Sequence, residues 1–429
     1  MTVPRDGSAA YVESSHRILE RCDELATVSV QPAAIERLYL TPEHARANRL
    51  AADWMRAAGM ASWQDEAGNQ CGRIEGATPG LPALVIGSHL DTVPDAGRYD
   101  GILGVMLAIE TVRLLVQRPG VTSSLPFALE VVAFGDEEGA RFGATLLGSR
   151  ALAGTWNDRW WDVIDENGVT LRRAFEDFGL DPEAVRSAAR GRADVVGYLE
   201  AHIEQGPYLD AADRSLGVVT SIAGARRFTC TLTGEARHAG GTPYERRHDA
   251  LCGASEAVLA VERLARATGC VGTVGHLRVE PDAVNVIPGE VEFSVDLRAE
   301  HDADRDATWV EVEAVLAEIC ARRGLTYTAH ERHRADAMSC TPALMAAVRA
   351  GIGVTGDADP LYLFSRAGHD TMAMADLTDV GMLFIRCADG ISHHPDESVR
   401  AHDVAAALMA MEACVLTLAR QDGDTTTAC

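Results

Sequence analysis

The sequence has few positive charges for its length. Lys and Arg together number 39 among 429 residues, against 63 Asp and Glu, which gives a net charge of −24 with neutral histidines. A chain of this charge repels polyanions, so binding to nucleic acid or to an anionic membrane surface is excluded. No run approaches 18 consecutive apolar residues, and polar and charged residues open the sequence where a signal peptide has an apolar segment. We therefore expect a cytoplasmic protein without nucleic-acid or membrane partners.

Closely spaced cysteine pairs are absent too. The ten cysteines are scattered, with no C-x-x-C pair, which favours reduced thiols over a disulfide framework. No internal repeat recurs at a fixed period, which excludes repeat architectures. The sequence is instead rich in apolar residues: 47% of its 429 residues are hydrophobic, which suffices for two or three domains with large cores.

Short apolar runs alternate with a helical pattern in the first part of the chain. Residues 83–87 and 127–134 are typical of buried strands, and residues 101–117 of a helix between them. This series predicts an α/β fold with a mostly parallel central sheet flanked by helices. Ligands bind such sheets at the carboxyl ends of the strands. The loops 88–100 and 135–143 therefore mark the expected site.

The pattern changes near residue 215 to strands that alternate in a two-residue period. The expected strands are 227–233, 290–298 and 325–333, and the expected helices are 249–268 and 308–323. This order indicates a small α+β layer. A buried strand at 380–385 and a helix at 402–420 then resume the first pattern. We predict a discontinuous first domain, 1–214 and 336–429, with a second domain, 215–335, inserted into it.

Carboxylates and histidines gather in the loops that follow the predicted strands. His89 directly follows the first strand, with Asp91 and Asp100 close behind. It offers a neutral imidazole as a ligand, and the two acids can orient it and bridge metals. Glu137 and Glu138 follow the next strand, where one can bind metal and the other can accept a proton. Without a metal, the first of these segments would hold only a turn aspartate and a core histidine, and the second would be a solvated acidic loop.

Two further segments place histidines beside acids. His202 lies between Glu200 and Glu204, and His393 and His394 lie shortly before a predicted helix. Either segment could carry only a surface histidine with a cap. Together, however, the four segments supply three histidines and two carboxylates, which is the inventory of a two-metal site with a shared carboxylate.

These motifs resemble those of the aminoacylase and carboxypeptidase-G type dinuclear metallohydrolases. The motif segments are 87–101, 135–143, 200–207 and 390–397. The similarity is to the ureido-hydrolysing branch, which comprises N-carbamoyl-L-amino acid hydrolases, β-ureidopropionases and allantoate amidohydrolases, and it extends from about residue 16 to 415. It implies that the inserted domain is a ferredoxin-like lid that also forms a homodimer.

The resemblance also implies a ligand set. One metal would be held by His89, Asp100 and His202, and the other by Asp100, Glu138 and His393, with Asp100 bridging. Glu137 takes the position of the catalytic base, and Asp91 that of the acid that orients His89. His394 stands where the family pattern has Asn, so the two adjacent histidines could exchange roles.

Three further residues match substrate-binding segments of the family, and two more are candidates for substrate contact. His238 would reach a site shared across the dimer, while Asn285 and Arg298 would bind the substrate carboxylate. The Arg fork suits a carboxylate, although a surface Arg and a buried capping His are the alternatives. Gln205 would contact substrate, and His369 would either line the pocket or cap the following helix.

The resemblance implies hydrolysis that depends on two divalent cations, with Mn²⁺ or Zn²⁺ as the first candidates and Co²⁺ as the next. Glu137 would take a proton from the attacking water and return it to the leaving nitrogen, with His238 at the oxyanion. We expect allantoate as substrate, with ureidoglycine or ureidoglycolate, ammonia and carbon dioxide as products. Segments 87–101 and 382–387 look most similar to the allantoate branch. The alternatives are an N-carbamoyl-L-amino acid hydrolase or β-ureidopropionase, an N-acyl amino acid deacylase or peptidase, and a catalytically silent ureide-binding protein.

Overall fold

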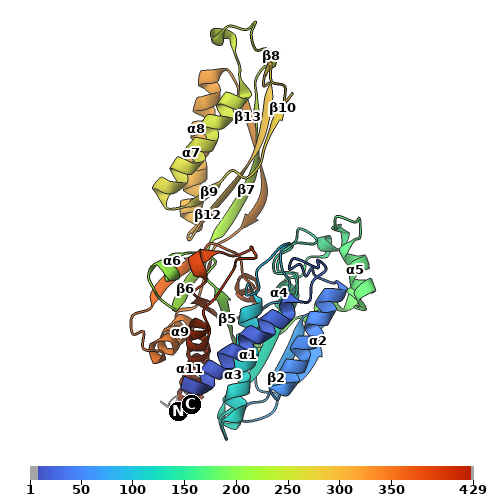
Figure 1. Cartoon of the computed structure of the whole chain (residues 1–429), viewed down its shortest axis with the longest axis vertical. Helices are drawn as coiled ribbons and strands as arrows, with labels where there is room; N and C mark the ends of the chain where they lie inside the picture. Colours follow the sequence, from blue (N-terminus) through green and yellow to red (C-terminus); the bar gives the residue numbers. More distant parts are fainter. Residues whose placement is uncertain (1–7, 427–429) are drawn as a thin grey trace. The chain divides into compact units, whose positions relative to one another are not determined.

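The computed structural model of the chain describes residues 8–426, which form two compact units (Figure 1). The larger unit consists of residues 8–220, 340–363 and 369–426. The smaller unit consists of residues 221–339 and 364–368. The chain therefore leaves the larger unit and later returns to it.

The main sheet has nine strands in the described part of the chain, and all but β14 lie wholly or mostly in the larger unit. The strands are β1 (Ala61–Gln64), β2 (Gln70–Ile74), β3 (Ala83–His89), β4 (Ala128–Phe134), β5 (Val195–Ile203), β6 (Leu216–Ile222), β14 (Met338–Ser339), β15 (Leu361–Ser365) and β16 (Val380–Ile385). Their order is β1-β2-β4-β3-β5-β16-β6-β14, and β15 pairs with β6.

The middle strands of this sheet run parallel and the outer ones antiparallel. β3 is parallel to β4 and β5, and β16 is parallel to β5. β2 is antiparallel to β4, and β6 is antiparallel to β16. The α/β architecture predicted from the sequence is confirmed, but the sheet is mixed rather than mostly parallel. The turn between β1 and β2 is too short for the crossover that a parallel pair needs, so these strands pair antiparallel.

Helices of the larger unit pack on the sheet and on one another to form its core. They are α1 (Ser8–Ala26), α2 (Pro42–Ala57), α3 (Ile102–Gln117), α9 (Pro342–Val354) and α11 (Ala401–Thr426), with the short helices α4 (Leu147–Leu152), α5 (Leu171–Phe178), α6 (Tyr208–Ala211) and α10 (Thr371–Met374). Every residue of β3, β4 and β16 is buried, as expected for strands with helices on both faces. α11 is long and apolar enough to span a bilayer, but 67% of its most apolar window is buried inside the protein, so it serves as a core helix.

The smaller unit has a ferredoxin-like arrangement. Its strands are β7 (Gly224–Thr233), β9 (Val271–Thr273), β10 (Leu277–Glu280), β12 (Glu290–Ala299) and β13 (Thr326–Ala335), and its helices are α7 (Ala250–Thr268) and α8 (Asp302–Arg323). The sheet order is β10-β12-β7-β13, with β9 on β12, and the two helices pack side by side along it (Figure 1). This is the split βαβ order predicted from the sequence.

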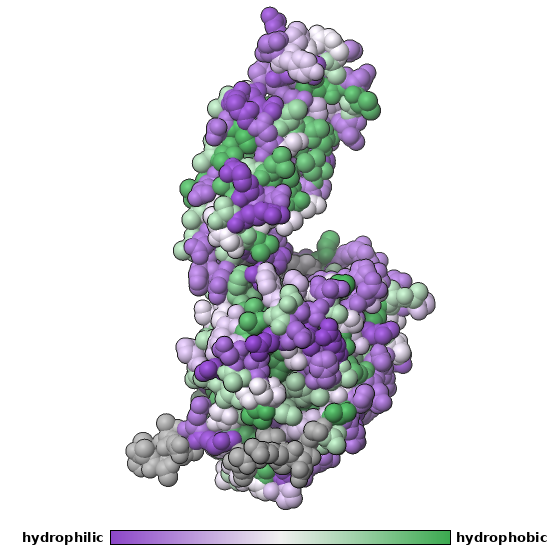
Figure 2. Space-filling view, turned by 60° about the vertical axis from the view of Figure 1, so that its left-hand side comes forward, coloured by the Kyte–Doolittle hydropathy of each residue, from purple (hydrophilic) through white to green (hydrophobic). Residues whose placement is uncertain are grey.

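Helix α8 begins six residues earlier than the periodicity predicted. Asp302 and Asp304 lie in its first turn, where their negative charges interact favourably with the positive end of the helix dipole. This interaction stabilises a first turn that has no apolar periodicity. A separate two-stranded ribbon pairs β8 (Arg237–His238) with β11 (Val286–Ile287). Hydrophilic and hydrophobic patches are intermingled over the visible surface (Figure 2). Leu259 of α7 and Val310 of α8 are exposed.

Candidate metal centre and active site

The predicted metal ligands meet at one edge of the central sheet. His89 is the last residue of β3, and His202 lies next to the end of β5. Asp100 immediately precedes Gly101, the N-cap of α3. The φ of Gly101 is 69°, and a Cβ there would meet the His89 imidazole at 2.3 Å, so only glycine lets the aspartate approach the ring.

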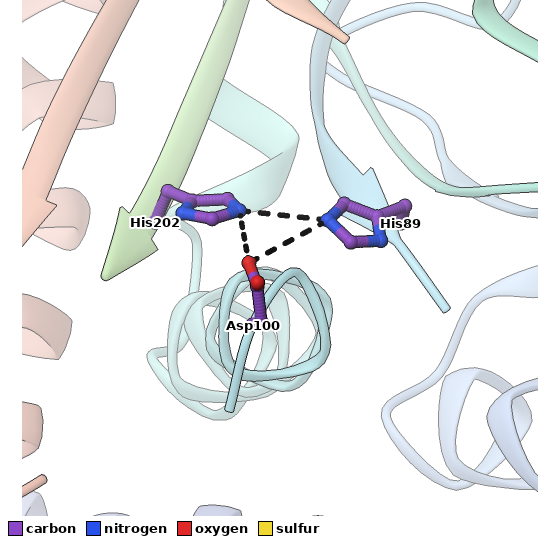
Figure 3. A group of neighbouring side chains, drawn as sticks. All are labelled: His89, Asp100 and His202. Atoms are coloured by element: carbon purple, nitrogen blue, oxygen red, sulfur yellow. Dashed lines mark hydrogen bonds and ion pairs between the residues drawn. The ribbon is translucent and has the colours of Figure 1, made fainter. Parts of the chain in front are cut away.

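Two imidazole nitrogens and one carboxylate oxygen converge in the first ligand group, which consists of His89, Asp100 and His202 (Figure 3). His202 Nε2 lies 3.1 Å from Asp100 Oδ1 and 3.5 Å from His89 Nε2, and His89 Nε2 lies 3.9 Å from Asp100 Oδ1. The edge of a tetrahedron with metal bonds of about 2.1 Å is roughly 3.4 Å. The three separations therefore fit a common metal ion.

The orientation of both imidazoles also suits a metal. His89 Nδ1 lies 3.1 Å from the Asp91 carbonyl oxygen, and His202 Nδ1 lies 2.9 Å from the Ile203 carbonyl oxygen. A carbonyl accepts only, so each Nδ1 carries the hydrogen and each Nε2 points its free lone pair into the group when the ring is neutral. Histidines that bind metal through one ring nitrogen usually donate the N–H of the other to a carbonyl or carboxylate, which fixes the orientation of the ring.

The first group requires positive charge at its centre. Burial opposes ionisation of Asp100, but hydrogen bonds from His202 and His393 outweigh it and hold the Asp100 pKa well below its ordinary value. Burial likewise opposes a charged His202, yet the hydrogen bond to Asp100 raises its pKa. Either protons or a cation can satisfy this demand, and a divalent cation does so while both rings stay neutral.

A second ligand group shares Asp100 with the first. His393 Nε2 lies 3.0 Å from Asp100 Oδ2 and 3.3 Å from Glu138 Oε1. Hydrogen bonds to Asp100 and then to Glu138 raise the His393 pKa to about 10. The two oxygens of Asp100 thus face different groups, which is the arrangement of a bridging carboxylate. His394 is exposed and its Nδ1 accepts from the Asp396 N–H instead.

Gln205 and Ser392 line the second group. The Gln205 amide donates to Asp100 Oδ2 at 2.9 Å and lies 3.4 Å from His393 Nε2. The Ser392 hydroxyl donates to the same oxygen of Asp100 at 2.9 Å. The Gln205 side chain therefore lies against the predicted metal ligands.

Glu137 lies beside both groups in a dry environment. Only 8% of its surface is exposed, and one carboxylate oxygen lies within 4.8 Å of ligand atoms of His89 and Glu138. Burial, together with the charges of Glu138 and Asp370, raises the Glu137 pKa well above its ordinary value. A carboxylate that holds a proton more readily than usual suits a group that must accept one and pass it on.

Asp91 does more than the sequence predicted. Its carboxylate oxygens accept the backbone N–H groups of Glu137 and Glu138, each at 3.1 Å. The distance from its Oδ1 to His89 Nδ1 is 3.6 Å, longer than the bond of that nitrogen to the Asp91 carbonyl. The side chain of Asp91 thus fixes the backbone of the two glutamates, while its carbonyl orients the imidazole.

The remaining residues that the sequence predicted to contact substrate are divided between the two units. His238 and Asn285 are neighbours on the ribbon of the smaller unit, where the Ala239 N–H donates to the Asn285 carbonyl at 2.9 Å. Arg298 lies on β12 of the same unit, with about a third of its side chain exposed. His369 is fully buried in the larger unit, with its ring edge-to-face at 4.4 Å from His202. No side chain caps α10, and the backbone at Asp370 begins that helix.

Sequence reasoning missed three buried residues that hold the site together. Arg37 donates to the Leu90 carbonyl at 2.6 Å, between His89 and Asp91. The Asn69 carboxamide accepts from the Gly135 N–H, and Glu397 accepts from the Tyr99 and Asp100 N–H groups. Burial raises the Glu397 pKa to about 7, with the charge of Asp100 adding to it. The only sequence signal was for Glu397, which lies four residues after His393.

The fold and the site together define a metal-dependent hydrolase, since paired ligand groups with one shared carboxylate and a desolvated glutamate suit activation of water. The model of Peptidase family M20/M25/M40 matches residues 85–417, and the chain belongs to that family. This confirms the resemblance seen in the sequence.

Several named relatives share most of the chain. Allantoate deiminase of Arabidopsis thaliana is 39% identical over 421 residues, covering 91% of this chain and 80% of the relative. N-carbamoyl-L-amino-acid amidohydrolase of Paenarthrobacter aurescens is 39% identical over 386 residues, covering 89% of this chain and 93% of the relative. The crystal structure of a hydantoinase/carbamoylase family amidase from Burkholderia multivorans has a TM-score of 0.87 at 32% identity, covering 94% of this chain and 98% of that one. The chain is therefore a hydrolase.

Proposed function

We propose that this protein hydrolyses a ureido C–N bond of a small ureido carboxylate, and that its substrate is allantoate. The observation that carries the proposal is the convergence of two ligand groups on Asp100, beside the buried Glu137. The relatives named for allantoate and for N-carbamoyl amino acids support the ureido class. The products would be ureidoglycine or ureidoglycolate, ammonia and carbon dioxide.

The ligand groups fit two divalent cations. His89, Asp100 and His202 would hold one, and Asp100, Glu138 and His393 the other. Mixed imidazole and carboxylate donors accept Zn²⁺, Mn²⁺ and Co²⁺, and the resemblance favours Mn²⁺. When bound, such cations supply Lewis acidity to the ureido carbonyl and to water.

Proton transfer falls to Glu137. Its raised pKa suits it to take the proton of the attacking water and then to protonate the departing nitrogen, which leaves poorly as an anion. Asp91 holds the Glu137 backbone through its N–H, so the carboxylate keeps its position during both transfers. Glu138 is fixed by the same side chain.

His238 is prepared to donate a hydrogen bond. Its Nδ1 accepts from the Gly241 N–H at 3.0 Å, which leaves the hydrogen of a neutral ring on Nε2. The ring is exposed, so Nε2–H is available to a developing oxyanion. We propose this role for His238 in a site shared across a homodimer, in which the inserted domain, residues 215–335, acts as lid and dimerisation domain.

Arginines of the smaller unit suit a negatively charged substrate. A surface pocket of about 460 Å³ is lined by Arg227, Arg298 and Arg366, with Asp296 as the acid among them. Asp296 accepts from Arg298 Nε at 3.1 Å and from Nη2 at 3.2 Å, and Arg298 Nη1 donates to the Arg366 carbonyl at 2.8 Å. The guanidinium is therefore oriented, and a substrate carboxylate would use the remaining hydrogens of Nη1 and Nη2. Three arginines against one aspartate make this pocket locally positive despite the net charge of −24, which supports binding of the substrate carboxylate by Arg298. We further propose Asn285, which lies outside this lining, as its partner.

Allantoate is preferred to the alternatives on chemical grounds. Its second ureido arm brings hydrogen-bonding groups that an apolar N-carbamoyl amino acid lacks, and a site built for them discriminates strongly. Segments 87–101 and 382–387 resemble the allantoate branch. N-carbamoyl-L-amino acids are the second candidate, because a relative of that name is equally identical to this chain. The predicted ligands and Glu137 are all present, which argues against a silent ureide-binding protein.

A substrate panel on chelated and metal-reconstituted protein tests the proposal. Ammonia release is measured with allantoate, N-carbamoyl-methionine and β-ureidopropionate, and amine release with N-acetyl amino acids and dipeptides. We expect activity only after Mn²⁺ or Zn²⁺ is returned, and a higher kcat/KM for allantoate than for the others. Faster turnover of N-carbamoyl-methionine would move the assignment to the second candidate. Preference for N-acetyl substrates would refute the ureido class.

A further inference from the structure

The segment that carries His393 is a loop closed at its base. The Ala388 N–H donates to the Ser398 carbonyl at 2.9 Å, which joins the two ends. Just outside them, Arg386 forms a buried ion pair with Asp403 at 2.8 Å. Such contacts fix where the loop starts and ends, but they leave the position of His393 near its tip to be set by other groups.

Glu397 ties this loop to the segment before α3. Its Oε1 accepts from the Tyr99 N–H at 2.6 Å and the Asp100 N–H at 3.2 Å. Its Oε2 lies 3.0 Å from the Ser392 hydroxyl, which is itself 2.9 Å from Asp100 Oδ2. One buried side chain therefore contacts the backbone of Asp100 and the residue preceding His393.

The segment before α3 leaves room for the Glu397 side chain at Gly97. A Cβ built there would lie 2.3 Å from the Glu397 carboxyl carbon and 2.4 Å from its Cβ. The second of these atoms cannot swing away without moving the loop itself. Gly97 is therefore needed as glycine because Glu397 occupies the space next to it, which is evidence of close packing between the two segments.

We propose that Glu397 is a positioning residue that sets the distance between Asp100 and His393 and thereby the affinity of the second cation. This inference rests on the two-metal site of the proposed function. Asp100 and His393 come from segments almost 300 residues apart in sequence, and the Glu397 bridge together with Ser392 ties them directly. The first group shares Asp100 but takes no ligand from this loop, and Asp100 Oδ1 is also held by His202, so this group should keep its cation without Glu397.

Metal stoichiometry and affinity test the proposal without substrate. Chelated protein is titrated with Zn²⁺ by calorimetry, and bound metal is counted after desalting. In Glu397→Ala we expect the first cation to bind as in the wild type and the second to bind at least tenfold more weakly. Gly97→Ala should give the same selective loss, because it keeps the carboxylate but displaces it. Glu397→Gln should restore two cations, since its amide oxygen accepts both N–H groups and its NH₂ can donate to Ser392.

Glu412→Gln is the matched control. Glu412 is a fully buried carboxylate of α11 in the same unit, where it pairs with Tyr11 and Arg118. Its substitution should lower the melting temperature without changing either metal affinity. Two wild-type-like Zn²⁺ affinities in both Glu397→Ala and Gly97→Ala would overturn the inference and leave the proposed function standing. A wild-type protein that binds one cation only would overturn both.

Discussion

The two units present their candidate functional groups in opposite ways. In the larger unit, His89, Asp100 and Glu137 are buried among other charged groups and fixed backbone, and of the predicted metal ligands it is His393 that is exposed, at 46% of its side chain. In the smaller unit, His238 is exposed and Arg298 is partly so. Buried groups exchange solvation for fixed neighbours, so their geometry and charge are set by folding. Exposed groups remain solvated until a ligand arrives, so they can be changed at little cost to stability.

The strongest test of this contrast is Glu137→Gln. Loss of the proton acceptor should lower kcat by about 10²–10⁴, while both metal affinities and substrate affinity stay near wild type. The measurement is single-turnover ammonia release, alongside a Zn²⁺ titration. Glu66→Gln, an exposed acid of the same unit, serves as control and should keep full activity. Activity surviving in Glu137→Gln would mean that another group is the base.

His238→Ala should have the next largest effect. Removing the Nε2–H donor should reduce kcat by about 10²–10³ and leave the melting temperature unchanged, because the ring is exposed. Steady-state kinetics and thermal unfolding report the two quantities. His276→Ala alters another exposed histidine of the same unit and should be silent. A drop in melting temperature of several degrees in His238→Ala would show that the residue is structural after all.

Arg298→Lys should mainly affect substrate binding. Lysine keeps the charge but loses the two-pronged contact and the orientation given by Asp296, so KM should rise about 10- to 100-fold with a smaller change in kcat. Initial rates over a range of substrate concentrations separate the two parameters. The same exchange at the exposed Arg278 should leave KM as it is. An unchanged KM in Arg298→Lys would place the carboxylate elsewhere.

The smallest effect concerns pH and the buried His44 of α2. Burial lowers its pKa from 6.5 to about 4 in the folded protein, so between these values the unfolded chain binds a proton that the folded chain does not. Its contribution to stability is therefore complete above pH 6.5 and is lost as the pH falls toward 4. Wild type should lose up to about 1.4 kcal/mol per pH unit more than His44→Gln in this range.

Urea unfolding at pH 4, 5, 6 and 7 measures that difference in slope. The exposed His330 of the smaller unit is the control, and His330→Gln should follow the wild-type pH profile. Parallel profiles for His44→Gln and the wild type would show that His44 does not couple folding to protonation.

Local patterns in the sequence predicted most of the elements that position the site. The strand predicted at residues 83–87 is two residues longer in the structure, so β3 ends on His89 itself. The helix after Asp100 and the strand at 380–385 were found within one residue of their bounds. Apolar periodicity identifies such elements because their burial leaves a direct trace in residue type. The antiparallel outer strands left no such trace, since strand direction depends on which partner lies alongside.

The site was predictable in its residue types but not in its connections. Histidines and acids after strands indicated metal binding, and the structure brings five of them into two groups. Neither the sequence spacing nor the residue types indicated that Asp91 would hold the Glu137 and Glu138 backbone. The contact of Glu397 with the Asp100 N–H was equally hidden, because both partners had to be placed first.

The sequence by itself determined the α/β class, the family and the inventory of ligands, because these follow from residue type and short-range spacing. Tertiary structure alone decided that the two oxygens of Asp100 face different ligand groups and that both imidazoles present Nε2. It also decided which buried side chains brace them. The physical reason is that a hydrogen bond between segments far apart in the chain depends on the packed positions of both, which no local pattern encodes.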